Sequence, residues 1–428
     1  MMGKYILILG FILFSGKKMN SQDLNKHVEL STSKVTENDN DLKQLSSYFN
    51  DITLVGMGES THGTHEFFTM RHRMFKYLVE NHQFNTFFLE ADYASCLRAN
   101  AYIHGKKDDA IKVVKEIGLW PWQTYEMVAL IKWMRAYNLE NPISKLNFVG
   151  VDMQQYLETI TQMDNILRKY NLSTTDDNIY QRMLNTNFHQ VNKSDDLEIY
   201  KTTWAEKKAI DISVFNQKDE YTYTILLRHL TQIINGKNKL GKKPDYRDKK
   251  MAENILFYQN ENTLTKGFFW AHNGHVMKSI FNEGKKKESG SAGGYLKQKM
   301  GSQYFVIGQD FEEGTFNAYF PDSNSLKNLE GDTYTLGPVT VTPFLKSSFI
   351  TNYGTLKSPV FINCSYLPQK KHIELSSIGA AYYPDKNGNH KSKNSRFYHE
   401  KSEFDAIILI QKSTATHLLE DLTNNNGN

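Results

Sequence analysis

The chain has 428 residues, enough for one large domain or two. Hydrophobic residues make up 39% and charged residues 23% of it, which is typical of a globular protein and excludes a disordered or collagen-like chain. The net charge is only +4, too weak a basic bias for a nucleic-acid binder, so we expect no nucleic-acid partner.

The N-terminus carries a short apolar run, residues 5–14, directly after Lys4. The run is too short to span a bilayer and is typical of the core of a signal peptide. We therefore predict a signal peptide over residues 1–21, cleaved near Ser21, and an exported or periplasmic protein. The alternative is translation from Met19, which would leave the protein in the cytoplasm. No later segment is apolar enough to span a membrane, so we expect no stable membrane insertion.

Six short apolar runs, rich in β-branched and aromatic residues, follow one another along the chain and predict β-strands. Two amphipathic patterns with helical spacing, residues 67–79 and 127–137, lie between the early runs. This alternation is typical of an α/β fold with a mostly parallel central sheet flanked by helices, whose strands are covered on both faces. The six runs are residues 52–57, 86–89, 146–151, 267–271, 304–308 and 406–410.

The middle of the chain differs from the two ends. Residues 154–260 are polar and contain helical patterns at 222–234 and 249–258. We interpret this segment as a helical subdomain inserted into one α/β domain, whose two parts are residues 22–153 and 261–428.

Two later stretches lack a clear period. Residues 289–295, SGSAGGY, predict a flexible loop because their side chains are small. The mixed pattern of residues 333–384 predicts irregular structure with a few short strands.

The two cysteines, Cys96 and Cys364, lie far apart, and neither belongs to a C-x-x-C pair. Cysteine-based zinc sites and thioredoxin-type redox sites are therefore not expected. We interpret both residues as buried thiols.

Polar side chains follow five of the predicted strands at the point where each strand ends. Because the carboxyl ends of parallel strands meet at one edge of a sheet, these side chains are expected to lie close together. Any one of them is also explained as a helix N-cap, but all five together predict a polar site. The residues are Glu59 and His62, then Glu90 and Asp92, Asp152, His272 and His275, and finally Gln309 and Asp310.

The histidines and carboxylates of this set suit the activation of water. A histidine takes a proton from water at neutral pH, and a carboxylate hydrogen-bonded to it fixes its tautomer. Thr69 breaks the H-E-x-x-H pattern that begins at His65, and no G-x-S-x-G surrounds Ser60. The same side chains would also bind a divalent metal ion, and the residue types alone leave both uses open.

Six motifs in order carry a family resemblance: GESTHGTHEFF, FLEADY, LWPWQTYEMVALIKWMRAYN, FVGVDMQ, RDKKMAEN and FWAHNGHV. From about residue 52 to residue 316 the chain resembles the erythromycin esterase family. The resemblance implies an α/β core with a helical insertion and a deep cleft. It implies hydrolysis of the lactone ester of a macrolide such as erythromycin by activated water, and hence antibiotic resistance. The implied partners are a small-molecule macrolide or related ester and water, with no cofactor.

The resemblance also assigns residues by motif. His62 corresponds to the general base and Glu59 to its partner, and Glu90 matches a second active-site carboxylate. His272 and His275 match a histidine pair of the family. The motif around Arg247 is expected to be structural, with its guanidinium in a salt bridge near the cleft.

Three further residues are candidate substrate contacts, each with an alternative. Trp122 would line an apolar cleft or belong to the core. Arg98 would contact substrate or be a surface charge. Asp152 would contact substrate or have a structural role, such as a helix N-cap. His65 and His72, on the first predicted helix, are interpreted as structural. No residue is assigned to a metal. The alternative functions are a metal-dependent hydrolase of another ester, peptide or envelope substrate, and a protein that binds its ligand without turning it over.

Overall fold

The computed structural model describes residues 27–35, 38–185, 195–236, 245–262, 265–281, 289–321, 334–341, 359–367, 373–383, 397–399 and 401–419. The predicted signal peptide, residues 1–21, lies outside these residues, so export stays a prediction. Among the helices described, none combines the length and the apolarity needed to cross a bilayer.

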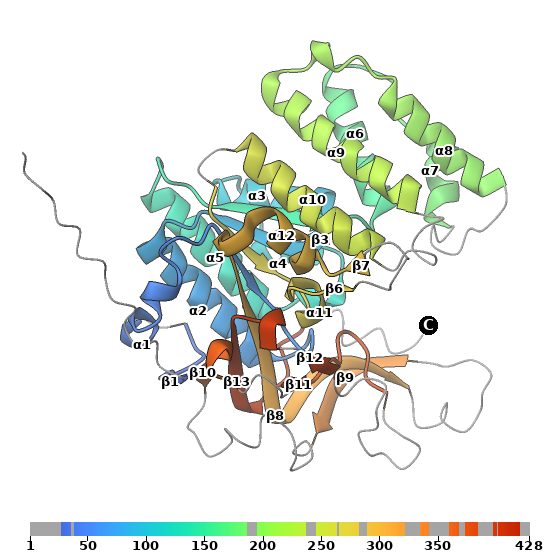
Figure 1. The fold of residues 1–428 in the computed structure, drawn as a ribbon. Helices are drawn as coiled ribbons and strands as arrows, with labels where there is room; N and C mark the ends of the chain where they lie inside the picture. Colours follow the sequence, from blue (N-terminus) through green and yellow to red (C-terminus); the bar gives the residue numbers. More distant parts are fainter. Residues whose placement is uncertain are drawn as a thin grey trace, which may run out of the picture.

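Within the described residues, a sheet of nine strands lies at the centre of the molecule (Figure 1). Its order is β1-β10-β13-β8-β2-β5-β3-β4, and β9 pairs with β8. The strands from β13 to β4 are parallel, whereas β10, β1 and β9 pair antiparallel. The strands are β1 His27–Glu29, β2 Leu54–Met57, β3 Thr86–Asp92, β4 Asn147–Asp152, β5 Gly267–Trp270, β8 Tyr304–Pro321, β9 Tyr334–Val341, β10 Val360–Asn363 and β13 Ala406–Ser413.

All six predicted strands are confirmed, and they are the six parallel ones. In β2, β3 and β5 every residue is buried. Parallel strands with helices on both faces need apolar side chains in both directions, which explains why their sequences are nearly continuous apolar runs. The predicted α/β class with a mostly parallel central sheet is therefore correct.

Two hydrophobic cores lie on opposite faces of the sheet. The helices α2, His65–His82, and α5, Tyr125–Glu140, pack on the first face, where Phe75 contacts the strand residues Phe87 and Phe268. The second face is covered by α10, Tyr246–Glu261, and α12, Ala292–Met300. Both predicted helices that precede the insertion are thus confirmed. The other described α-helices outside the helical insertion are α1 Asn40–Lys43, α3 Tyr93–Ile103, α4 Ala110–Lys115 and α11 Asn273–Val276.

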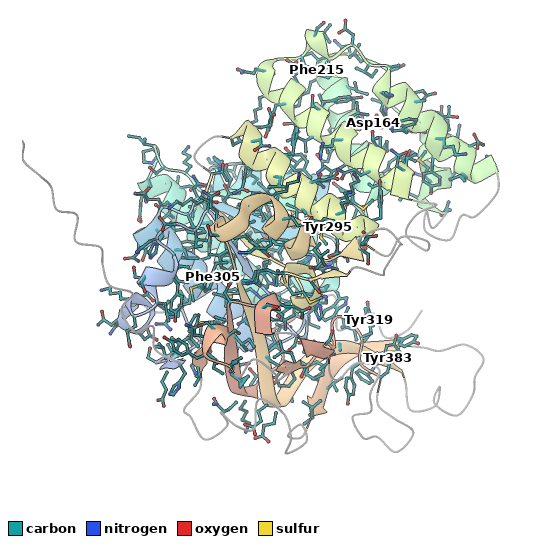
Figure 2. All side chains as sticks on the ribbon, in the orientation of Figure 1. Asp164, Phe215, Tyr295, Phe305, Tyr319 and Tyr383 are labelled. Carbon is teal, nitrogen blue, oxygen red and sulfur yellow. The ribbon has the colours of Figure 1, made fainter. Side chains whose placement is uncertain are left out.

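Between β4 and β5 the described chain is helical: α6 Tyr156–Lys169, α7 Asp177–Leu184, α8 Asp195–Lys208, α9 Gln217–Gly236 and α10. The helices α6 to α9 form a lobe that projects from the sheet in Figure 1. Figure 2 shows Asp164 and Phe215 in this lobe, where Asp164 forms a buried ion pair with Lys207. The last helix, α10, returns to the sheet, and the Asn254 amide donates to the Val151 carbonyl (2.9 Å). The domain boundaries themselves stay a prediction.

Residues 289–295 are not a flexible loop, and that prediction is wrong. They form β7, Ser289–Gly290, which pairs with β6, Ile280–Phe281, and the first turn of α12. A Cβ atom at Gly293 would lie only 1.8 Å from the carbonyl oxygen of Val276. The small side chains therefore permit close packing of backbone on backbone.

The C-terminal part of the chain completes the sheet. Residues 333–384 contribute the antiparallel strands β9 and β10, and β11, Ile373–Leu375, pairs with β12, Phe397–His399, in a separate ladder. Cys96 and Cys364 are both buried thiols, as predicted.

Candidate active site

The site lies where the connections that follow two neighbouring strands go to opposite faces of the sheet. The neighbouring strands β2 and β5 are parallel, but the chain leaves β2 for α2 on one face and leaves β5 for α11 and α12 on the other. Such a divergence opens a crevice beyond the carboxyl ends of the strands, where α/β proteins bind ligands. The predicted residues that the structure brings together here by direct contacts are Glu59, His62, Glu90, Asp152, His272 and His275.

The turn after β2 holds a carboxylate–imidazole pair. His62 Nδ1 donates to Glu59 Oε1 at 2.5 Å, the two residues being one short turn apart. Glu59 is fully buried, whereas 13% of the His62 side chain is exposed. The backbone amide of His62 also donates to the carbonyl of Gly379 (3.1 Å), which fixes the turn from the other side. With Nδ1 bonded to the carboxylate, the proton is held there and Nε2 is left as the basic nitrogen.

Glu59 is itself held by two donors on its second oxygen. Arg71 Nη1 donates to Oε2 at 2.6 Å, and the Trp270 indole donates to the same atom at 3.2 Å. The other guanidinium nitrogens donate to the carbonyls of Met57 and Gly58, at the end of β2. Burial lowers the pKa of Arg71 to about 10, against the opposing effect of Glu59, so the guanidinium stays charged at neutral pH.

A second carboxylate cluster lies next to this pair and is centred on Arg247, from α10. Arg247 Nη2 donates to Glu90 Oε1 and to Asp152 Oδ2, both at 2.6 Å. Burial would raise the pKa of Glu90, but His275 and Arg247 hold it well below its usual value. The prediction that Arg247 forms a salt bridge near the site is confirmed, and it ties α10 to the ends of β3 and β4.

His275 is bound within the cluster through both of its ring nitrogens. Its Nδ1 lies 2.8 Å from Asp248 Oδ1 and its Nε2 lies 3.2 Å from Glu90 Oε1. Burial alone would lower its pKa, but the carboxylates of Glu90 and Asp248 raise it to about 10. Arg247 Nη1 also lies 3.1 Å from Nε2, so both ring nitrogens of His275 are engaged by buried charged groups, which makes it a poor candidate for the base.

His272 differs from His275 in that its surroundings favour the neutral imidazole. Its Nδ1 accepts from the backbone amide of Gly274 (3.1 Å), which caps α11, and its Nε2 faces the carbonyl of Ser60 (3.4 Å). Burial, reinforced by the neighbouring histidines His62 and His275, lowers its pKa to about 3. Its backbone amide donates to Glu90 Oε2 (2.9 Å). His272 is therefore a neutral imidazole with both nitrogens bonded, which suits a structural cap at the site.

Two further aspartates lie at this edge, Asp92 as the last residue of β3 and Asp310 within the longer strand β8. Burial and the nearby charge of Asp152 raise the pKa of Asp92 to about 7, although its Oδ1 accepts from the amides of Gln154 and Gln155. Asp310 Oδ2 accepts from the amide of Ser376 (2.9 Å), and burial raises its pKa to about 6. Both carboxyl groups anchor loops around the site.

The three predicted substrate contacts are placed differently. Trp122 is 1% exposed and packs edge-on against His62, with ring centroids 6.1 Å apart, so it supports the histidine from the core side. Asp152 is fully buried against Arg247. Arg98 is not brought to the cluster, because Asp108 and Glu116 bind its guanidinium on α3.

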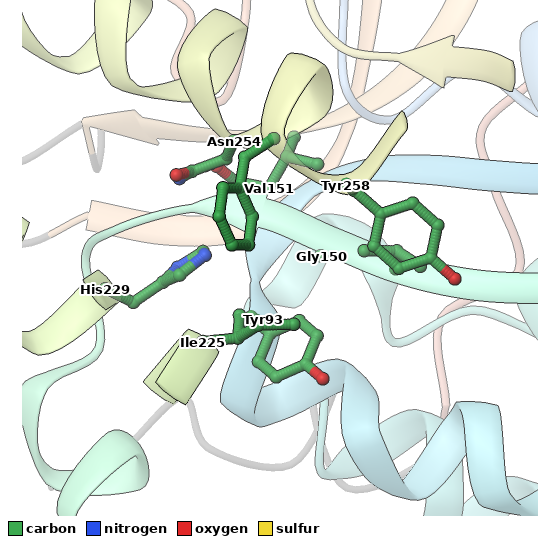
Figure 3. A pocket seen from close by; sticks show the side chains of 9 residues that line it. Tyr93, Gly150, Val151, Ile225, His229, Asn254 and Tyr258 are labelled. Carbon is green, nitrogen blue, oxygen red and sulfur yellow. The ribbon is translucent and has the colours of Figure 1, made fainter. Parts of the chain in front are cut away.

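A small cavity lies behind the site, between β4 and the helices α9 and α10 (Figure 3). Its volume of about 10 Å³ is no more than a single water needs, so it is too small for a substrate. His229 borders it and bonds the carbonyl of Asp152 through Nδ1 (3.0 Å). The cavity marks where the helical lobe supports the strand that carries Asp152.

Comparison with known proteins adds to this geometry. The family model for erythromycin esterase matches residues 79–413. The chain belongs to the erythromycin esterase family. It is accordingly an enzyme, a hydrolase that acts on ester bonds.

The relatives of this erythromycin esterase homologue are distant. Erythromycin esterase type II of Escherichia coli is 24% identical over 350 residues, which are 73% of this chain and 81% of that protein. A solved structure named a succinoglycan biosynthesis protein superposes with a TM-score of 0.72 at 22% identity, covering 92% of this chain and 97% of that one. A mutant of the erythromycin esterase EreC, in its open conformation, superposes with a TM-score of 0.62 at 15% identity, covering 89% and 96% of the two chains. At such identities the two solved structures show the fold alone.

The family match differs in extent from the motif resemblance. It continues to residue 413, whereas the resemblance extends only to about residue 316. It also begins at residue 79, after the turn that carries Glu59 and His62. The pairing of these two residues therefore rests on the geometry of this chain rather than on the matched range.

Sequence reasoning missed two residues that shape the site. Arg71 clamps Glu59, and its signal was a charged residue on the face of α2 that also carries the buried Phe68 and Phe75. Asp248 follows Arg247 and bonds His275, but a carboxylate in the first turn of a helix is too common to be singled out.

Proposed function

We propose that this family member hydrolyses a cyclic ester, with the lactone of a macrolide as the candidate substrate, by means of water activated at His62. The observation that carries the proposal is the buried Glu59–His62 pair, 2.5 Å apart. It leaves Nε2 of a partly exposed imidazole as the basic nitrogen at the edge where α/β proteins bind ligands. Membership of an esterase family supplies the bond type.

In the proposed reaction His62 Nε2 takes one proton from water while the water oxygen attacks the ester carbonyl. The carbonyl oxygen becomes an oxyanion, and its collapse breaks the bond to the ring oxygen. The imidazolium then returns the proton to the leaving alkoxide, so the products are one carboxylic acid and one alcohol. Glu59 stabilises the imidazolium and holds its orientation, as the carboxylate does in other imidazole-based hydrolases.

The charges around the site favour a mechanism without a metal ion. Arg71 neutralises Glu59, and Arg247 neutralises Glu90 and Asp152, so these carboxylates already have cationic partners. His275 and His272 are poor ligands, since metal ligation needs a free imidazole nitrogen and both nitrogens of each ring already have partners. In this proposal Glu90, His272 and His275 hold the crevice in shape and His62 alone transfers protons.

Mass spectrometry of erythromycin incubated with purified protein tests the proposal. Wild type, His62→Ala and His62→Asn would run side by side, each with and without EDTA, and His27→Asn would serve as a control on the exposed edge strand β1. We expect a mass gain of one water from wild type and from the control, insensitive to EDTA and absent in both His62 variants. Loss of the product with EDTA would refute the metal-free mechanism.

The remaining outcomes are also informative. No product from wild type removes the macrolide as the substrate, and a panel of cyclic and linear esters follows. Product from His62→Asn at the wild-type rate overturns the assignment of the base. The melting temperature of the His62 variants should stay near that of wild type, because the imidazole lies at the surface of the crevice. If macrolides are hydrolysed, the proposed consequence for the cell is macrolide resistance, which growth in erythromycin would measure.

A further inference from the structure

Beyond β13 the described chain crosses the start of α2 and reaches α5. We call residues 414–419 the C-terminal strap. Its Thr414 amide and hydroxyl donate to the two carboxylate oxygens of Glu66 at 2.7 Å each. Further along, the amide of Thr416 donates to the carbonyl of Gly63 (2.9 Å), and the amide of Tyr125 donates to the carbonyl of His417 (2.9 Å). The strap thus joins the turn that carries His62 to the N-terminus of α5.

Two imidazoles and one carboxylate converge under the strap. Glu126 Oε1 lies 2.6 Å from His65 Nδ1 and 2.7 Å from His417 Nδ1. The two rings are perpendicular, with centroids 5.1 Å apart. Each residue offers one ligand atom, and these atoms all lie within 4.8 Å of one another. Three elements that are distant in sequence, α2, α5 and the strap, therefore present two nitrogens and one oxygen to the same point.

The cluster is anchored at one side and open at the other. The Glu126 side chain is 5% exposed, that of His65 is 24% exposed and that of His417 is 67% exposed. A groove of about 280 Å³ borders the three residues, with Phe68 and Tyr125 among its walls. His72 also lines this groove, and its buried Nε2 atom has no hydrogen-bond partner among the described residues.

We propose that His65, Glu126 and His417 bind a divalent transition-metal ion of the Zn²⁺ type. Two imidazole nitrogens and one carboxylate oxygen are a ligand set that such ions favour, and the open side of the groove leaves positions for water or a further ligand. Ligand atoms at about 2.0–2.2 Å from a tetrahedral ion lie about 3.3 Å apart, so the present contacts would widen by less than an ångström. The His417 side chain is 67% exposed, so its ring can shift by that amount without disturbing the core.

Binding would replace the two Nδ1 protons by bonds to the ion. Each proton would pass to Nε2 of the same ring or to solvent, and no oxidation state would change. The ion would then fasten the strap to the start of α2. This site lies outside the crevice of Glu59 and His62, so the inference does not depend on the proposed function.

Isothermal titration of the full-length protein with ZnCl₂, after removal of metals by EDTA and dialysis, tests the site. Four proteins are compared: wild type, His417→Gln, Glu126→Gln and the control His27→Gln, which removes an exposed histidine on β1. We expect one ion per chain for wild type and for the control. The two cluster variants should lose at least the about 10- to 100-fold in affinity that removal of even an outer-shell partner costs.

A second measurement guards against misfolded variants. ZnCl₂ should raise the melting temperature of wild type and of the control, but not that of His417→Gln, whose exposed side chain can be replaced without disturbing the core. If Glu126→Gln fails to fold, His65→Gln takes its place. Equal affinity in all variants would show adventitious binding and overturn the proposal. Absence of binding to wild type would also overturn it and leave the cluster as a hydrogen-bonded clamp.

Discussion

Replacing Glu59 by glutamine tests how the carboxylate controls His62. Glu59 Oε2 accepts from two donors, Arg71 Nη1 and the Trp270 indole, so that position must hold an acceptor atom. In Glu59→Gln the amide oxygen therefore occupies it, and the NH₂ group turns towards His62 Nδ1. Nδ1 must then accept, the imidazole proton moves to Nε2, and Nε2 can no longer take a proton from water.

The size of the effect follows from this change of tautomer. Where a comparable carboxylate in a catalytic triad is replaced by its amide, kcat falls by about 10⁴-fold, equivalent to about 5 kcal/mol. The stability should change as well, because Arg71 is buried and loses its charged partner, at a cost of about 3–5 kcal/mol. Spread over one cooperative unit of 428 residues, this lowers the melting temperature by about 3–6 °C.

The assay is hydrolysis of whichever ester wild type accepts, followed by mass spectrometry well below both melting temperatures. Glu66→Gln is the matched control, since Glu66 lies on the first turn of α2, just after the turn that carries Glu59, and contacts Thr414 rather than His62. We expect the control to keep wild-type activity. Glu59→Gln with more than about a tenth of the wild-type kcat/KM, a loss of less than about 1.4 kcal/mol, would refute the tautomer argument.

Three other predictions concern the surroundings of the site. The pKa of His275 is raised from 6.5 to about 10, so His275 adds stability that is fully present below pH 6.5 and is lost as the pH rises through 10. In urea titrations the free energy of unfolding of wild type should exceed that of His275→Gln at low pH, and this difference should shrink between pH 6.5 and 10. Arg247→Gln should cost about 3–5 kcal/mol in the same assay. Lys250→Gln, which breaks a more exposed pair on the same helix, should cost at most about 1 kcal/mol. Gly293→Ala should cost about 1–3 kcal/mol or more by calorimetry, whereas Gly337→Ala, with its nearest neighbour 3.7 Å away, should cost much less through packing.

The parallel part of the sheet could be predicted from the sequence because its strands are buried on both faces. The antiparallel strand β9 was not predicted as such, since exposed and buried residues are mixed along it. β10 is fully buried, but its four residues lie within the stretch of mixed pattern at 333–384, so they were not singled out as a strand. Such strands are defined by their partners, here β8 and β13, which lie far away in the sequence.

The site could be predicted to the extent that topology alone assembles it. Glu59, Glu90 and Asp152 each lie at or just beyond the carboxyl end of a parallel strand, and the sheet brings them to one edge whatever their partners are. The pattern of the sequence does not identify their partners Arg71 and Arg247, because both come from helices whose rotation about their axes depends on packing; the salt bridge of Arg247 was expected only from the family resemblance. Arg98 could not be excluded from the site by sequence for the same reason. Only the structure shows that Asp108 and Glu116 already pair with its guanidinium.

The two histidines of the HNGH segment show why a motif does not assign chemistry. His272 and His275 are one helical turn apart, yet burial lowers the pKa of the first to about 3, whereas the second is raised to about 10 because two carboxylates outweigh its burial. Neither Glu90 nor Asp248 is near them in the sequence, so the residue type and spacing are the same for both roles. The difference bears directly on the reaction. Both nitrogens of each ring already have partners, which supports the proposal that His62 is the base in this cluster.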